Sequence, residues 1–307
     1  MIIPSPRRLA PDFYVLGTPH LPVYLLGQGT EWTLLEGGMH WMTELVYAQL
    51  RLVVPQLEHV RHWFITHAHY DHCGLLSTLY PRLPRVQVYA SAKTVQVFQQ
   101  AKSRAIIERF NQEVTRRRWV AEATATETVS LAELPVMPLP HSSVVQIGRH
   151  RTLRVLATPG HSACQLSLWD AEHSQLFAAD ALGEYHGAGE WLPLIFDDFQ
   201  AYVESIRHLE GLKATTLALG HHQVLIGDEA VQAPRRSLTS LARFGDWLHT
   251  RLHAGSAPDQ LAQELTARFA TPSADFLPAG LHQQSMLRLI QVLQQANYTP
   301  TLEQSLV

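Results

Sequence analysis

The sequence predicts an α+β fold in which two β-sheets pack face to face between outer helices (an αββα sandwich), followed by an all-helical extension. Short apolar segments of β-type composition fall into two groups along the chain, and segments with helical spacing alternate with them. Sheets that bury one face against each other and the other against helices accommodate both kinds of segment. Residues 231–307 show helical spacing only.

Each predicted strand is a short apolar run bounded by Gly, Pro or polar residues. The predicted strands are residues 13–16, 23–26, 33–35, 62–65, 86–90, 144–147, 153–157, 165–169, 175–179 and, as the last, 216–219. Helices are predicted for residues 43–52, for the segment ending at residue 80, for 91–119 and for 198–209. Residues 122–139, rich in Ala, Thr and Glu, are predicted to be a loop.

The C-terminal part of the chain predicts three helices. The first covers residues 235–253, the second begins near Pro258, and the third covers 279–298 with apolar residues on nearly all sides. A helix of the last kind must be buried against something. The predicted domains are therefore 1–230 and 231–307, with the helical extension covering the active site of the first.

Composition excludes several classes of protein. The chain has 307 residues, 46% of them hydrophobic, and no apolar run long enough for a membrane span. The N-terminal residues lack the apolar core of a signal peptide, and two cysteines cannot form a disulfide framework, so we expect a cytoplasmic protein. A net charge of -3 argues against direct nucleic-acid binding. Cys73 and Cys164 are interpreted as buried thiols.

A histidine-rich turn follows the strand predicted at 62–65. It places four side chains able to bind a metal within six residues: His67, His69, Asp71 and His72. Solvated or core histidines are the simplest alternative, and they would explain one isolated histidine. They explain this cluster poorly, because grouping several desolvated imidazoles with a carboxylate requires a compensating cation. The turn therefore predicts a metal site.

Three later positions offer further ligands, each at the end of a predicted strand. His161 follows Thr-Pro-Gly, Asp180 ends an apolar strand, and His221 and His222 follow Gly220. Loops at strand ends commonly carry functional groups. Taken singly, each position is a weak signal, because a histidine after Pro-Gly is usually a turn residue and an aspartate after a strand is usually a cap.

The run from His67 to His72 resembles the signature of the metallo-β-lactamase superfamily, whose members are mostly dinuclear metallohydrolases. The resemblance implies that His67, His69 and His161 bind one metal. It assigns Asp71, His72 and His221 to a second metal, with Asp180 bridging both, and it gives Asp71 and Asp180 the catalytic roles. His221 is preferred to His222 because it directly follows Gly220. Imidazole and carboxylate ligands suit iron, zinc or manganese.

Segments outside the ligands resemble a narrower family, the PqsE-like (or HmqE-like) 2-aminobenzoylacetyl-CoA thioesterases of alkylquinolone biosynthesis. These segments include Glu36-Gly37-Gly38, the five residues from Asp180 to Glu184, and the six from Pro193 to Asp198. The resemblance implies two metal ions, with iron expected. The implied substrate contacts are Glu184, Phe196, Ser273, His282 and Ser285.

The same resemblance implies a second role, in which a quorum-sensing transcriptional regulator is a partner. The basic patch expected for this role is thin, because Arg243 is accompanied by Asp246 and Trp247. The segment 243–247 is also compatible with a homodimer. Regulator binding is therefore a weaker expectation than the chemistry.

The predicted reaction is thioester hydrolysis. Two cations bridged by Asp180 would lower the pKa of a bound water, and the resulting hydroxide would attack the thioester carbonyl. The thiolate leaving group needs little protonation, because a thiol has a reference pKa of ~8.5. Two alternatives stay open: another ester, lactone or glutathione-thioester hydrolase of the same fold, and a regulatory protein whose metal site is structural.

Overall fold

The structure is a computed structural model that describes residues 5–118, 128–148, 151–222, 224–269, 277–296 and 298. By its contacts the chain divides into two compact units. The first takes in Met1–Ala157, Cys164–His173 and Gly220–Gln223, and the second takes in Thr158–Ala163, Ser174–Leu219 and Val224–Val307. The boundary predicted near residue 230 stays a prediction.

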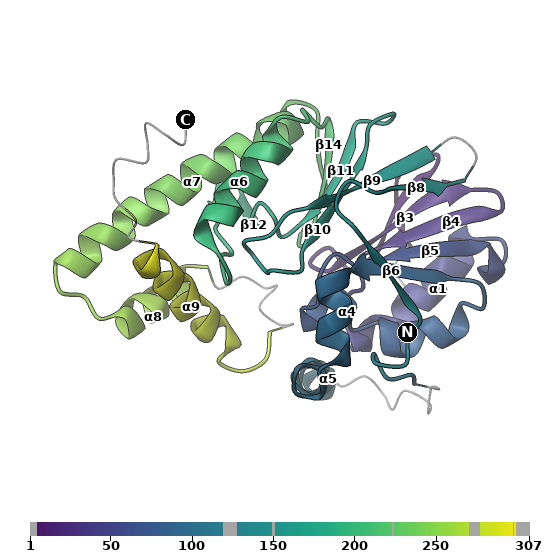
Figure 1. Cartoon of the computed structure of the whole chain (residues 1–307), viewed down its shortest axis with the longest axis horizontal. Coiled ribbons are helices and arrows are strands. Elements are labelled where there is room, and N and C mark those ends of the chain that lie inside the picture. Colours follow the sequence, from purple (N-terminus) through teal and green to yellow (C-terminus); the bar gives the residue numbers. More distant parts are fainter. Residues whose placement is uncertain are drawn as a thin grey trace. The chain divides into compact units, whose positions relative to one another are not determined.

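The first unit is built on a seven-stranded sheet in the sequential order β1 to β7 (Figure 1). Its strands are β1 Arg7–Ala10, β2 Phe13–Gly17, β3 Pro22–Gln28, β4 Glu31–Leu35, β5 Val60–Phe64, β6 Gln87–Ser91 and β7 Val136–Leu139. Strands β1 to β4 pair antiparallel, and β4 to β7 pair parallel. Each parallel step requires a crossover, which helices supply.

The crossover helices of the first unit account for much of its remaining regular structure. They are α1 Thr43–Val53, α2 Tyr70–Cys73, α3 Leu76–Leu79, α4 Ala92–Gln99 and α5 Ala101–Arg117, with short 3-10 turns at His40–Met42, Leu57–His59 and Tyr80–Arg82. Three antiparallel strands complete the unit: β8 Val144–Ile147, β9 Arg151–Ala157 and β10 Leu166–Asp170. Because β4 and β5 run parallel, their carboxyl ends lie at one edge, which is where α/β sheets collect ligands.

The second unit combines five strands with four helices in its described part. Its strands are β11 Gln175–Ala179, β12 Glu184–Gly187, β13 Glu190–Leu192, β14 Thr216–Leu219 and β15 Val224–Ile226. Its helices are α6 Phe199–Glu210, α7 Asp228–His253, α8 Pro258–Arg268 and α9 Leu281–Gln295 (Figure 1). The four helices share one apolar core, to which α7 contributes Leu238, Leu241 and Leu248 and α9 contributes Met286 and Leu289.

Several predicted boundaries were wrong. Residues 136–139 form β7 instead of a loop, because an exposed strand that contains Pro138 is tolerated at a sheet edge. The helix predicted at 91–119 is interrupted at Gln100, whose backbone is extended, and residues 119–127 lie outside the described part. The strand at 216–219 is followed by β15, so it is not the last. Helix α7 begins at Asp228 and passes through Pro234.

The continuation of α7 through Pro234 has a tertiary cause. A proline in a helix interior destabilises the helix by ~3 kcal/mol, so the sequence favours a helix that begins after Pro234. Here Ala230, Ala233 and Pro234 are all buried, so packing of the first turns offsets that cost. In the described ranges, no helix combines the length and the apolar character needed to cross a bilayer.

Candidate metal centre

The histidine-rich turn leaves the carboxyl end of β5 and leads into α2. His67, Asp71 and His72 are buried, and His69 caps the short helix with an extended backbone. The turn is fastened from two sides. The amide of Leu75 donates to the carbonyl of Gly37 at 2.8 Å, and the amide of Leu166 donates to the carbonyl of Thr66, also at 2.8 Å.

Gly37 allows this close approach. A Cβ added there would lie 2.4 Å from the carbonyl oxygen of His72, a separation that no side chain could occupy. The glycine therefore lets the segment after β4 lie directly against the segment that carries the histidines.

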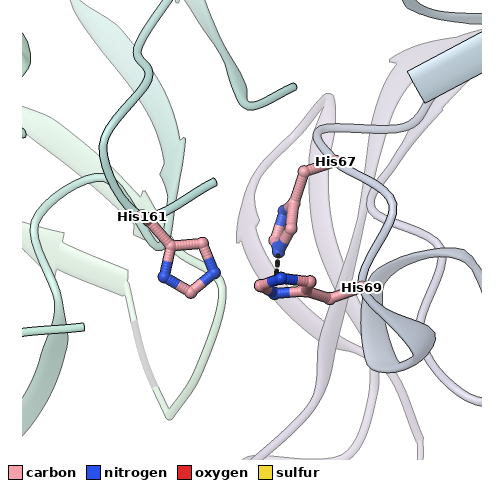
Figure 2. Close-up of side chains that lie close together, drawn as sticks. All are labelled: His67, His69 and His161. Carbon is pink, nitrogen blue, oxygen red and sulfur yellow. Dashed lines mark hydrogen bonds between the residues drawn. The ribbon is translucent and has the colours of Figure 1, made fainter. Parts of the chain in front are cut away.

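Among the predicted ligands of the first unit, two pairs of ring nitrogens face each other at short range. Nε2 of His67 lies 3.0 Å from Nδ1 of His69 (Figure 2), and Nε2 of His72 lies 3.3 Å from Nε2 of His221. Two nitrogens bound to one tetrahedral zinc at about 2.05 Å would lie about 3.3 Å apart. Both observed separations are close to that distance.

Asp71 joins the second of these pairs. Its Oδ2 lies 3.8 Å from Nε2 of His72 and 3.7 Å from Nε2 of His221. The three residues are buried, and their ligand atoms all lie within 4.8 Å of one another. The group is thus the right size and composition for one metal ion.

Each of these histidine rings has one nitrogen that faces the other predicted ligands and one that faces away from them. Hydrogen bonds to the nitrogen that faces away determine which of the two nitrogens faces the ligands. Nδ1 of His72 lies 2.8 Å from Oε2 of Glu36, and Nδ1 of His221 lies 3.3 Å from the carbonyl oxygen of His20. Nδ1 of His67 lies 3.1 Å from Oγ1 of Thr66. A proton on each Nδ1 leaves Nε2 as the lone-pair donor, which is the arrangement typical of metal-bound histidine.

Glu36 supports two of these rings at once. Its Oε2 accepts from Nδ1 of His72 and also from the hydroxyl of Thr66 at 3.2 Å, and Thr66 in turn accepts from His67. Glu36 is buried and has a left-handed backbone (φ 74°), a conformation that non-glycine residues rarely adopt. Strained backbone of this kind clusters at functional sites.

The second unit holds the other two predicted ligands together. Nε2 of His161 lies 3.3 Å from Oδ2 of Asp180, and Nδ1 of His161 lies 2.8 Å from the carbonyl oxygen of Leu194. His161 therefore also presents Nε2, in the same way as His67, His72 and His221.

Local backbone geometry positions these two side chains. Gly160 has φ +124°, and an added Cβ would lie 2.3 Å from the Cα of Tyr202 on α6, so only glycine fits before His161. Ala179 has a left-handed backbone (φ 48°) at an irregularity in the pairing of β11 with β14. Such irregularities redirect side chains at the end of a strand, here Asp180.

The residues present fit a metal. Within the described ranges, the ion pairs of the buried carboxylates Asp71 and Glu36 are with histidines and not with Lys or Arg, so a nearby cation would offset the cost of burying them. All donors are imidazole or carboxylate. Burial, followed by the charges of Asp71, Cys164 and Glu36, raises the pKa of Cys73 well above its usual range, so this neighbour stays a neutral thiol.

Comparison with known proteins identifies the family. The family model described as the metallo-beta-lactamase superfamily matches residues 21–221. The chain belongs to this superfamily. The predicted fold class is thereby confirmed, and the matched range contains every predicted ligand from His67 to His221.

Curated relatives of the superfamily match part of the chain. Beta-lactamase-like protein 2 homolog of Caenorhabditis elegans is 25% identical over 205 residues, 66% of this chain and 56% of that protein. Acyl-coenzyme A thioesterase MBLAC2 of Gallus gallus is 31% identical over 148 residues, 47% of this chain and 48% of that protein. The chain thus spans about half the length of these relatives.

Solved structures of the superfamily match nearly the whole chain. A metallo-beta-lactamase family protein from Thermus thermophilus superposes with a TM-score of 0.61 at 22% identity, covering 94% of this chain and 95% of that one. An archaeal superfamily protein from Sulfolobus tokodaii gives a TM-score of 0.58 at 15% identity, covering 92% and 98%. At these identities the likeness shows the fold.

The predicted substrate contacts that the structure describes fall in the second unit. Glu184 begins β12 and lies 3.6 Å from Nε2 of His186. Burial lowers the pKa of His282, the charge of Glu184 raises it, and that of His186 lowers it further. The Phe196 ring lies 5.1 Å from the His161 ring.

The other two predicted contacts are serines. Ser285 lies on α9, one turn beyond His282, and is half-buried. Ser273 lies outside the described residues.

Sequence reasoning missed the supporting residues Glu36, Thr66 and His20, and it missed His186. A signal for Glu36 was available, because it is an acidic residue directly after the apolar strand β4, the same context that singled out Asp180. His20 acts through its backbone carbonyl, which no sequence motif reports.

Proposed function

We propose that this chain is a metal-dependent hydrolase that cleaves an acyl-CoA thioester. The observation that carries the proposal is the buried group of Asp71, His72 and His221, in which outer hydrogen bonds turn both Nε2 atoms inward. The similarity to a relative named acyl-coenzyme A thioesterase supports the choice of substrate class.

The proposed centre holds two metal ions. His67, His69 and His161 would hold one ion, Asp71, His72 and His221 would hold the other, and Asp180 would be a ligand shared by both. The ring-nitrogen separations in the first unit and the pairing of His161 with Asp180 in the second support this assignment. Iron is the metal implied by the narrower resemblance, and zinc and manganese suit the same ligands.

When bound, such a metal pair supplies a hydrolytic nucleophile at neutral pH and polarises the thioester carbonyl. The protein's own contribution is orientation. Glu36 holds the ring of His72 directly and the ring of His67 through Thr66, so the donor atoms need not reorganise on binding. No general acid is required, because the thiolate leaving group departs with little protonation.

Within this class, 2-aminobenzoylacetyl-CoA is the substrate that the resemblance favours. The carboxylate of Glu184, which lies 3.6 Å from His186 and acts electrostatically on His282, could accept a hydrogen bond from an aryl amine. Phe196 offers an apolar ring beside His161. A regulator partner, a homodimer, a cytoplasmic location and a covering role for the helical extension rest on the sequence alone.

Metal analysis coupled to a substrate panel tests the proposal. The panel contains 2-aminobenzoylacetyl-CoA, other acyl-CoA thioesters, acylglutathiones and lactones. We expect about two metals per chain and selective cleavage of acyl-CoA. Activity confined to acylglutathiones or lactones would retain the chemistry and overturn the substrate class.

Variants locate the activity in the proposed centre. His69→Ala should lose metal and turnover together, whereas His208→Ala, an exposed histidine on α6, should lose neither. Wild-type metal content and turnover in His69→Ala would overturn the assigned centre.

A further inference from the structure

Two side chains of α7 bond to the segment that follows Asp180. The hydroxyl of Ser237 donates to the carbonyl oxygen of Leu182 at 2.6 Å. The hydroxyl of Tyr185 donates to Oε1 of Glu229 at 2.5 Å. Helix α7 thus fastens this segment at two points, two and five residues beyond Asp180.

The segment between Ala179 and Tyr185 has little freedom of its own. The amide of Ala181 donates to the backbone carbonyl of Ala178 at 3.1 Å, and the amide of Gly183 donates to the backbone carbonyl of Asp180 at 3.0 Å. Two tight turns therefore follow each other. Gly183 has φ +86°, and an added Cβ would lie 2.4 Å from the carbonyl oxygen of Leu192. A shift of Leu182 would therefore be transmitted to Asp180.

The bond from Ser237 is well protected. Ser237 is 3% exposed and Leu182 is fully buried, so water cannot replace the hydroxyl if it is lost. A buried carbonyl without its donor is costly, and the segment would have to move to regain one. The next residue, Leu238, belongs to the apolar core shared by α6 to α9, which holds Ser237 in place.

We propose that Ser237 is a positioning residue for Asp180, acting through the carbonyl of Leu182, and that Tyr185 with Glu229 forms a second, outer tie. The helical extension then supports the metal centre through the segment that follows Asp180, a role distinct from covering it. This inference rests on the proposed function, because it assumes that Asp180 binds metal.

The expected effect is a loss of metal affinity. Removing a group that contacts a metal ligand typically lowers affinity about 10–100-fold. Ser237 acts one step further away, so we expect a loss of about tenfold in Ser237→Ala, toward the lower end of that range. A disturbed Asp180 should also change the visible absorption bands of the cobalt-loaded protein.

The test is a competition titration of cobalt and zinc against a chromophoric chelator, on the full chain. Ser237→Ala is compared with Thr239→Ala, a matched control whose hydroxyl, on the same helix, donates to the carbonyl of Arg235 one turn earlier. We expect weaker binding and altered cobalt bands in Ser237→Ala, and wild-type values in Thr239→Ala.

The Asp180→Asn variant distinguishes a failure of the proposed metal centre from a failure of the proposed role of Ser237. If Asp180→Asn binds metal as the wild type does, the proposed centre fails and the inference with it. If Asp180→Asn is impaired while Ser237→Ala stays within twofold of wild type, the inference alone is overturned. Where Ser237→Ala destabilises the metal-free protein, Tyr185→Phe carries the test, and wild-type affinity there overturns the proposal.

Discussion

Replacing Glu36 with glutamine tests whether a buried carboxylate behind the ligands maintains the metal site. The substitution keeps the size of the side chain and one acceptor oxygen, and it removes the charge. In the structure this carboxylate accepts from His72 at 2.8 Å and from Thr66 at 3.2 Å. A neutral amide would weaken both bonds, because charge-assisted hydrogen bonds are about twice as strong as neutral ones.

The expected loss of metal affinity is about 10–100-fold, the usual effect of removing the outer partner of a ligating histidine. That range corresponds to about 1.4–2.7 kcal/mol of binding free energy. The metal-free protein should respond differently. Glu36 is 3% exposed, so losing its charge removes a desolvation cost, and the free energy of unfolding without metal should not fall.

The assay combines chelator competition for affinity with urea unfolding of the metal-free protein. Glu44→Gln is the matched control, because the Glu44 side chain is 51% exposed and its pair with Arg82 lies at the surface. Wild-type affinity in Glu36→Gln would refute the reasoning. A large loss of metal-free stability would instead make Glu36 a structural residue.

Three further predictions follow from single positions. Gly160→Ala should lower the free energy of unfolding by about 1–3 kcal/mol, because its Cβ would meet the backbone of Tyr202. Gly187 also has a positive φ but has open space around it, so Gly187→Ala measures the cost of the backbone conformation without a clash. Equal losses of stability in the two variants would contradict the clash at Gly160. Because burial raises the pKa of Cys73, the folded protein should resist alkylation of this thiol at about pH 8, and peptide mass spectrometry after unfolding should show it labelled. Because burial lowers the pKa of His282 in the folded state, the unfolded state binds more protons below about pH 6.5, so stability should fall as the pH drops through that value. His282→Gln should flatten that dependence in urea titrations between about pH 5 and 7.5, and an unchanged slope would count against it.

The ligands of the histidine-rich turn could be predicted because they are local. His67, His69, Asp71 and His72 lie within six residues, and the apolar strand before them fixes their context. Strands β11 and β14 were predicted with their observed bounds, since both are short, apolar and bounded by turns. Local pattern was sufficient wherever the determining residues are neighbours in the chain.

Prediction failed where a distant partner decides the structure. Strand β7 exists because β6 offers an edge to pair with, although Pro138 argues against a strand. Helix α7 passes through Pro234 because its first turns are buried. The left-handed backbone of Ala179 lies where the pairing of β11 with β14 is irregular.

The sequence by itself determined the kind of donors, their order along the chain and the fold that carries them. The tertiary structure decided which atom of each ring faces inward. That choice depends on Glu36 for His72, on the carbonyl of Leu194 for His161 and on the carbonyl of His20 for His221. Each of these bonds joins segments more than thirty residues apart, and a hydrogen bond forms only when folding brings donor and acceptor to about 3 Å.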